Sequence, residues 1–115
     1  MTPFAEIAVA FASALVEGDF ARANGLLAPQ LRDQLSEATL REELYGMFRS
    51  YADGEPRSIH YDERFSMAEW PAKESHDVGW AYVSILGEDF VEAVAVIVAE
   101  VDGTLLIRAV EWGRP

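Results

Sequence analysis

The sequence predicts an α+β domain in which N-terminal helices pack on a curved antiparallel sheet of about four strands. Apolar residues recur at helical spacing through the first fifty residues, after which the period changes to two. The stretch from Gly79 to Trp112 reads as three β-runs joined by two tight turns, a pattern typical of an antiparallel meander. The chain has 115 residues, half of them apolar, which is enough for one core. We therefore expect a single domain over residues 1–115.

The first helix has a clear start and a clear end. Thr2 and Pro3 are typical of a helix start, with Thr2 as the N-cap and Pro3 at the first helical position. Gly18 is the expected end. Between them lies one apolar stripe at helical spacing, formed by Phe4, Ile7, Ala8, Phe11 and Leu15.

Further start and stop signals divide residues 19–56. Asp19 can cap a second helix, and Pro29 breaks it and begins a short helical turn. The sequence TLRE at 39–42 has capping-box spacing and predicts the start of another amphipathic helix. The turn at 53–56, DGEP, follows it.

From Arg57 the alternation predicts a strand. The polar residues of this strand form a solvated face, and Glu63 stands among the residues of the other face. Glu63 is thus expected as a carboxylate on the side that turns inward. Residues 67–77 read as a loop, since Pro71 excludes a central strand. The inward set is Ile59, Tyr61, Glu63 and Phe65.

The two turns of the meander set its register. Asp-Gly at 102–103 is a strong signal for a two-residue type I′ hairpin. The turn near 87–89 can have three residues or two, and the two-residue turn slips the pairing by one residue and exchanges the faces of the preceding strand. A three-residue turn puts Trp80, Tyr82, Val94, Val96, Val98, Ile107 and Glu111 on one face. The opposite face then carries Ala81, Val83, Ala93, Ala95, Ile97, Arg108 and Trp112.

Both faces of the predicted meander are apolar. A sheet covered on one side only should alternate apolar with polar residues. The helices can cover one face, so the other needs its own cover. A homodimer formed through this sheet face is the simplest candidate.

The composition excludes several classes of partner. There are 20 acidic residues against 9 basic ones, a formal charge of −11, which disfavours nucleic acid and anionic membranes. With no cysteine, the chain has neither disulfides nor a thiolate site. The apolar N-terminus lacks a basic region and carries Glu6, so it reads as an amphipathic helix rather than a signal peptide. We expect a cytoplasmic protein without a cofactor.

The order of elements, together with residues 11–29 (FASALVEGDFARANGLLAP), resembles the nuclear transport factor 2-like superfamily, also called the α+β cone or cystatin-like fold. The resemblance covers nearly the whole chain as pattern and topology, and names no subfamily. It implies a curved sheet around a long helix, a conical pocket between them, and frequent dimerisation through the outer face of the sheet. Members include ketosteroid isomerase-like and polyketide cyclase-like enzymes, epoxide hydrolases, and binding or scaffolding domains without chemistry.

The enzymes of this superfamily commonly carry an acidic residue just after the helices, in an Asp-Pro or similar context. Here Asp53 and the pair Glu55-Pro56 match that pattern only loosely. Glu63, with Tyr61 on the same face, is the stronger catalytic candidate, because an apolar pocket raises a carboxylate pKa and suits it to proton transfer. The alternative is that Glu63 reaches solvent or pairs with an arginine.

The last strands supply the candidate ligand-binding residues. Arg108 and Glu111 fall on opposite faces, so each face receives one charge that must meet either a ligand or a structural partner. Aromatic residues could line a pocket for a flat apolar ligand, or simply pack in the core. These aromatic residues are Trp80, Tyr82, Trp112 and, on the helices, Tyr45. His60 and His76 lie sixteen residues apart, without the spacing of a metal pair, and no metal site is predicted.

The sequence is consistent with three functions. The first is a noncatalytic module for assembly or for binding a small apolar molecule in a modest pocket. The second is an isomerase or cyclase that uses Glu63 for proton transfer. The third is an acidic protein-interaction module, which would need a clustered acidic face.

Overall fold

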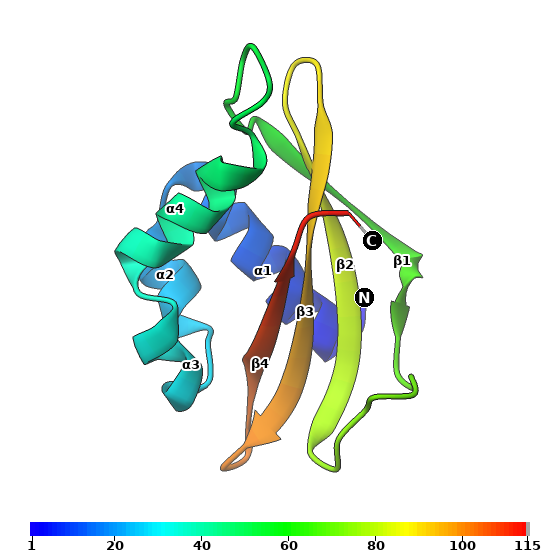
Figure 1. Cartoon of the computed structure of the whole chain (residues 1–115). Coiled ribbons are helices and arrows are strands. Elements are labelled where there is room, and N and C mark those ends of the chain that lie inside the picture. The colour runs from blue at the N-terminus through cyan, green and yellow to red at the C-terminus, as the bar shows by residue number, and fades with distance from the viewer. Residues whose placement is uncertain (115) are drawn as a thin grey trace.

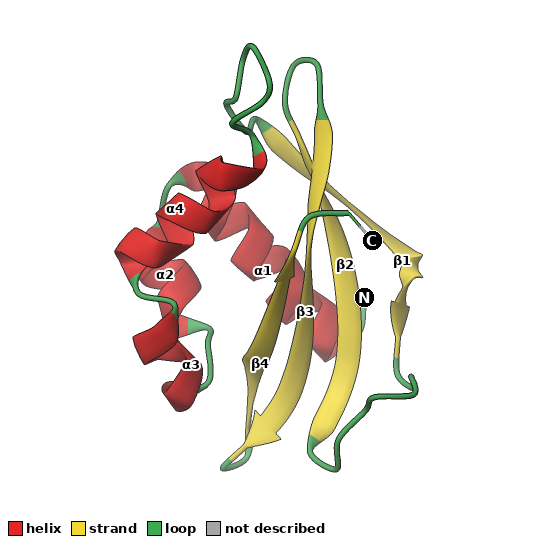
Figure 2. Ribbon diagram, in the orientation of Figure 1, coloured by secondary structure: helices red, strands yellow, loops and turns green. Residues whose placement is uncertain are grey.

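The computed structural model describes residues 1–114. Its helices and strands are α1 (Pro3–Glu17), α2 (Phe20–Gly25), α3 (Pro29–Gln34), α4 (Glu37–Met47), β1 (Ser58–Met67), β2 (Asp77–Leu86), β3 (Val91–Val101) and β4 (Thr104–Trp112). The strands form one antiparallel sheet in the order β1-β2-β3-β4, with the helices on one side of it (Figure 1). The predicted α+β class is therefore confirmed. The sheet is open and not strongly curled, in contrast to the expected cone (Figure 2).

The helix starts follow the local chemistry of the caps. Thr2 accepts a hydrogen bond from the Ala5 N–H at 3.3 Å, and Asp19 accepts one from the Arg22 N–H, as the sequence predicted. The predicted start of the last helix at Thr39 is wrong. Ser36 is the cap, because its hydroxyl accepts from the Thr39 N–H at 3.2 Å, so α4 begins three residues earlier than a cap at Thr39 would place it.

The β3–β4 hairpin forms at the predicted turn. Val101 pairs with Thr104, and the two turn residues Asp102 and Gly103 have φ of 52° and 81°, as a type I′ turn requires. A β-bulge then interrupts the pairing, since Val98 pairs with Ile107 but Ile97 pairs with Ala109.

Arg108 is the extra residue of this bulge, and it changes which side chains share a face. Beyond the bulge, Glu111 lies opposite Ala95 and Trp112 lies opposite Val94. The predicted grouping of Glu111 with Val94 and of Trp112 with Ala95 is therefore wrong. A bulge inserts one residue into one strand, so every later side chain moves to the other face.

The turn between β2 and β3 has four residues, 87–90, and pairs Leu86 with Val91. Tyr82 then lies opposite Ala95 rather than Val94. Neither the three-residue nor the two-residue turn considered from the sequence is found, but the four-residue turn exchanges the faces of β2 as the two-residue turn would have done. The two one-residue shifts compensate each other, so Trp80, Tyr82 and Glu111 still share a face.

The inner face of the sheet packs against the helices. It carries small and β-branched residues, namely Ala81, Val83, Ile85, Val94, Val96, Val98 and Ile107, all buried. Phe11 and Leu15 of α1 are buried against this layer in the same core cluster. Apolar burial of this kind is the main favourable term in folding.

At one edge of the sheet a short segment pairs with β4, and at the other edge the pairing of β1 is irregular. Residues 26–28 run parallel to β4, with the Ala28 N–H donating to the Ile107 carbonyl at 2.7 Å. At the other edge, β1 pairs with β2 at its two ends, and the register shifts between Tyr61 and Ser66. Such bulges are a common way to limit pairing at an exposed edge. Within residues 1–114, no helix is long and apolar enough to cross a membrane.

Gly79 permits the closest helix–sheet approach. A Cβ at this position would lie 2.3 Å from ring atoms of Phe4, the first buried aromatic residue of α1. We predict that Gly79→Ala lowers the free energy of unfolding by about 1–3 kcal/mol, because the ring must move out of a packed core. Denaturant unfolding followed by circular dichroism measures this.

Gly25 provides the matched control, since a Cβ there meets no atom within 4 Å. Gly25→Ala should be neutral or stabilising by up to about 1 kcal/mol. Equal losses in the two variants would contradict the close-approach explanation.

Candidate binding surface

Aromatic side chains fill the space between the helices and the sheet. Trp112 packs on Phe11, with ring centroids 6.5 Å apart, and Phe11 is fully buried. Nearer the turn at 87–90, Phe90 stacks on Tyr51 at 4.7 Å and contacts Phe48 at the same distance. These rings occupy the region in which a conical pocket was expected. Trp112, a predicted ligand-binding residue, therefore contributes to the core.

The partly buried polar pair Tyr51–Glu92 lies at one end of this aromatic layer. The Tyr51 O–H donates to Glu92 Oε2 at 2.6 Å, and Arg114 Nε lies 3.6 Å from Glu92 Oε1. The hydrogen bond to Glu92 is the main cause that raises the pKa of the Tyr51 hydroxyl, which remains a neutral donor. The sequence showed no signal for this pair, because Tyr51 appeared to continue the stripe of α4.

The side of the sheet that faces away from the helices carries a row of large apolar residues. Trp80 and Tyr82 lie side by side on β2 with ring centroids 6.3 Å apart, and Phe65 of β1 lies 5.7 Å from Tyr82. Phe65 is 51% exposed and Met67 is 41% exposed. We call this side the outer face. It consists of Phe65, Met67, Trp80, Tyr82, Ala93, Ala95, Ile97, Ala99, Leu106, Ala109 and Glu111.

On the outer face, the alanines of β3 form a surface that is recessed relative to the aromatic side chains of β2. Ala93, Ala95 and Ala99 are the alanines of β3 on this side, and all three are buried although no helix covers them. The indole N–H of Trp80 reaches across to Glu111 and donates to its Oε1 at 3.2 Å. A shallow recess of about 100 Å³ lies there, lined by Trp80, Tyr82, Ala95, Glu111, Trp112, Gly113 and Arg114.

Arg108 has a structural partner that the sequence analysis missed. Its Nε and Nη2 donate to the two carboxylate oxygens of Asp77 at 2.6 and 2.7 Å, and the Asp77 side chain is only 1% exposed. Asp77 also accepts from the Glu74 N–H, which fixes the loop before β2. The bulge at Arg108 directs its side chain across β3 to reach Asp77, so no pattern within one strand could reveal the pair.

An open recess of about 380 Å³ adjoins this pair. Its lining includes His76 and Gln30, and it carries an excess of carboxylates from the loop before β2 and from the β3–β4 turn. Both Nε and Nη2 of Arg108 are engaged by Asp77, so this predicted ligand-binding arginine has a structural partner within the sheet, the alternative that the sequence left open.

Glu63 lies on the helix side of β1 with Tyr61, where both line an open recess beside the start of α1. It is not enclosed in an apolar pocket, because its side chain is 75% exposed and lies 4.0 Å from the N-terminal amino group. Tyr61 remains on the inner side, and its hydroxyl shares a short hydrogen bond with Ser66. An open recess of about 300 Å³ separates these residues from the start of α1.

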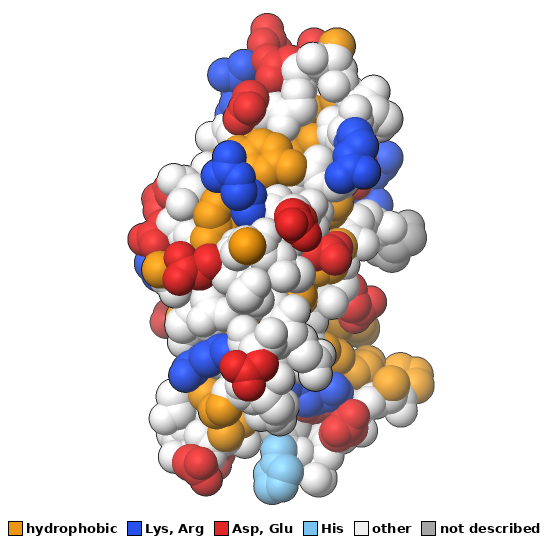
Figure 3. Space-filling model, turned by 60° about the vertical axis from the view of Figure 1, so that its left-hand side comes forward, with side chains coloured by type: hydrophobic (Ala, Val, Ile, Leu, Met, Phe, Trp, Pro, Cys, Tyr) orange, Lys and Arg blue, Asp and Glu red, His pale blue; other side chains and the backbone are white. Residues whose placement is uncertain are grey.

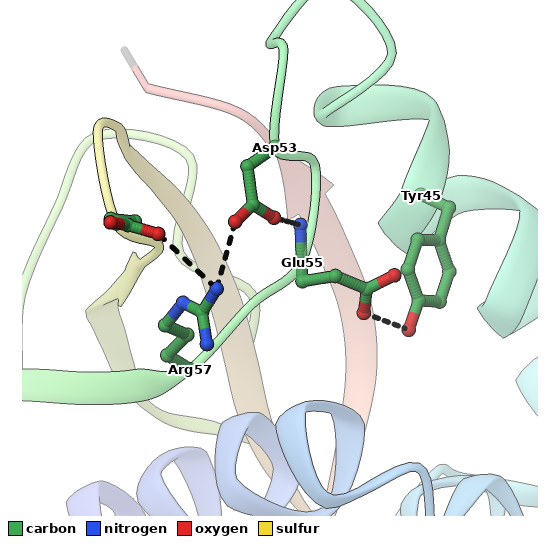
Figure 4. Close-up of polar contacts among 5 residues, drawn as sticks. Tyr45, Asp53, Glu55 and Arg57 are labelled. Carbon is green, nitrogen blue, oxygen red and sulfur yellow. Dashed lines mark hydrogen bonds and ion pairs between the residues drawn. The ribbon is translucent and has the colours of Figure 1, made fainter.

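Tyr45 belongs to the helix layer, away from the outer face. Its O–H donates to Glu55 Oε2 at 3.5 Å, at the turn that leads from α4 to the sheet (Figure 4). In the same turn Arg57 Nη2 donates to Asp53 at 2.8 Å and to Glu88 at 3.4 Å. Arg57 is the main cause that lowers the pKa of Asp53. These contacts join the helix exit to the β2–β3 turn.

The predicted site residues therefore fall into separate places. Trp80, Tyr82 and Glu111 come together on the outer face, whereas Glu63, Tyr45 and Arg108 each lie elsewhere. Residues 1–114 contain no group of three or more His, Asp or Glu side chains placed to hold a metal ion. Acidic side chains are spread among basic ones on the surface seen in Figure 3, rather than gathered into one patch.

Comparisons with family models, with curated proteins and with solved structures find no match to this chain.

The Asp77–Arg108 pair yields a test of stability. We predict that Asp77→Asn lowers the free energy of unfolding by about 2–4 kcal/mol, because it removes the charged partner of a half-buried guanidinium. Hydrogen bonds from Arg108 hold the pKa of Asp77 below its usual value. The stabilisation is thus present above the unfolded pKa, about 3.9, and is lost as the pH falls through the lower folded pKa.

Urea unfolding from pH 7 to pH 3 measures both effects. The wild-type free energy of unfolding should decrease below about pH 4, and Asp77→Asn should lack that component of the decrease. Asp33→Asn, at an exposed position of α3, is the control and should follow the wild type. An Asp77→Asn variant as stable as the control would show that the pair contributes little.

Proposed function

We propose that this chain is a noncatalytic assembly domain of the nuclear transport factor 2-like superfamily, and that it acts as a homodimer joined through the outer face. The order of helices before an antiparallel meander supports the family assignment, together with the segment at 11–29. The open sheet, and the packing of Phe11, Trp112 and Phe90 between the layers, favour assembly over ligand binding in a cone.

The outer face is the observation that carries the proposal. It places two aromatic residues, Trp80 and Tyr82, next to the exposed Phe65 and Met67 on a side that no helix covers (Figure 2). Exposed apolar patches of this extent on small proteins usually mark interaction sites. Aromatic and methionine side chains are the residue types enriched in interface cores.

The size of the sheet is sufficient for a stable interface. Four strands of about ten residues, spaced about 4.8 Å apart with a rise of about 3.3 Å per residue, present roughly 600 Å² in projection. Accessible surface exceeds projected area, and a standard interface buries about 800 Å² per partner. Two outer faces of this kind can therefore make a specific contact.

Ligand binding and catalysis have weaker support. The interior that would hold an apolar ligand contains Phe11, Trp112 and Phe90. Glu63 is well solvated, whereas a catalytic carboxylate of raised pKa needs burial or a like-charged neighbour. A role as an acidic interaction module finds no support in a clustered acidic surface on the side seen in Figure 3.

The proposal predicts a dimer at micromolar concentration. Tyr82→Asp should convert it into a monomer, because two uncompensated carboxylates would be buried in the interface. Sedimentation equilibrium measures the association, and circular dichroism verifies that each variant is folded.

Ala21→Asp adds the same charge at an exposed position of α2 and serves as the control. It should remain dimeric. A wild-type chain that is monomeric at 100 micromolar or above would refute the proposal, as would a dimer that Tyr82→Asp leaves intact while folded.

A further inference from the structure

We infer that the recess on the outer face, between Trp80, Tyr82 and Glu111, binds a quaternary ammonium group of the kind that choline carries. The recess belongs to a single chain, so this inference goes beyond the proposed function and does not depend on the dimer. The recess is also separate from the interior between the helices and the sheet, where a conical pocket was expected. The inference follows from the aromatic rings, the carboxylate and the size of the recess.

Two aromatic rings line the recess from β2. Trp80 and Tyr82 lie two positions apart on this strand, so their side chains leave the same side of the sheet. Their ring centroids are 6.3 Å apart and their ring planes differ by 32°. The recess measures only about 100 Å³, so an occupant lies close to both rings. A cation within about 6 Å of an aromatic centroid is attracted by the ring, most strongly by that of Trp.

Ala95 and Glu111 supply the floor and a negative charge. Ala95 pairs with Tyr82 on one side and with Glu111 on the other, so its short side chain leaves space between these two larger residues. The indole N–H of Trp80 donates to Glu111 Oε1 at 3.2 Å and thereby holds the carboxylate beside the ring. Glu111 is exposed at the rim, so its charge can meet a cation that enters from solvent.

The chemistry of the lining favours a quaternary ammonium over a primary one. A primary ammonium carries three N–H donors and is strongly hydrated, so it needs several acceptors in exchange for its water. Glu111 alone carries a carboxylate among the described side chains that line the recess. A quaternary ammonium has no N–H group, and its methyl groups can pack against Ala95 and the two rings. Sites lined by aromatic rings commonly recognise such groups.

Arg114 is the one cationic side chain among the described residues that line the recess. Its Nε lies 3.6 Å from Glu92 Oε1, and the Glu92 side chain is only 14% exposed. This carboxylate therefore offsets the charge of Arg114. The whole chain has a formal charge of −11, which favours the approach of a cation over that of an anion.

Three compounds of similar shape and different charge test the inference. Choline is cationic, 3,3-dimethylbutan-1-ol is neutral and 3,3-dimethylbutanoate is anionic. Choline should bind with a millimolar Kd, at least about fivefold lower than that of the neutral alcohol, because only the cation is attracted by the rings and the carboxylate. Equal binding of choline and the neutral alcohol would overturn the inference, as would tighter binding of the anion.

The Kd values come from titrations followed by the nuclear magnetic resonance signal of the Trp80 indole N–H. Titrations at several protein concentrations, extrapolated to infinite dilution, give the Kd of the single chain. Sodium chloride at equal ionic strength is the control for salt effects and should leave this signal in place. A choline-dependent shift that sodium chloride reproduces would overturn the inference.

Two variants locate the binding. Ala95→Leu fills the recess and should raise the choline Kd at least about tenfold. Ala99→Leu is its matched control, since both alanines lie on the outer face of β3, both are 3% exposed, and Ala99 lies outside the recess. Glu111→Gln keeps the shape of the side chain and should raise the Kd about threefold or more, whereas Glu42→Gln, exposed on α4, should not. Circular dichroism verifies folding, and an unchanged Kd in folded Glu111→Gln would overturn the inference.

Free compounds and modified proteins both carry quaternary ammonium groups, and a second ligand separates these sources. N-acetyl-trimethyllysine methylamide represents a methylated lysine side chain, and choline represents a free compound. Binding of either one supports the inference, and the tighter of the two identifies the source. A chain that binds neither overturns the inference.

Sedimentation equilibrium with and without choline separates the inference from the proposed function. The recess lies within the surface that the proposed dimer buries, so saturating choline should raise the dimer Kd. A chain that binds choline but never dimerises removes the proposed function and leaves the inference standing. A dimer whose chain binds none of the compounds overturns the inference alone.

Discussion

The structure depends on the packing of α1 against the inner face of β2 and β3. Small and β-branched side chains on these strands make a flat inner surface, and Gly79 lets the ring of Phe4 approach the backbone directly. Phe11 then reaches Trp112, and this ring pair packs between the two layers. The alternation along β2 that turns its small and β-branched residues toward the helices places Trp80 and Tyr82 on the other side of the sheet. The strand that forms the core thus also forms the outer face.

One irregularity in the sheet decides which charge reaches that face. The bulge at Arg108 sends its guanidinium to Asp77 and moves Glu111 to the outer face. Glu63 lies on the opposite side, in the recess that it lines with Tyr61 beside the start of α1. The charged residues of the strands therefore have different surroundings. Arg108 joins β4 to β2 across β3, while Glu111 remains exposed at the rim, beside Trp80.

Local signals in the sequence were sufficient to predict most of the fold. The caps at Thr2 and Asp19 and the type I′ turn depend on neighbouring residues, and they are found as predicted. The candidate site was predicted less well, because it depends on register. A bulge in β4 and a four-residue turn each moved side chains to the opposite face. The Asp77–Arg108 pair joins residues 31 positions apart across an intervening strand, and alternation within a strand carries no information about it.

Intermolecular nuclear Overhauser effects in a mixed sample of labelled and unlabelled chains test the central claim most directly. The account predicts intermolecular contacts that involve the ring protons of Tyr82 and that occur only among outer-face residues. Intermolecular contacts that map to the helices, or a chain that shows none at millimolar concentration, would contradict the claim that the outer face is the working surface.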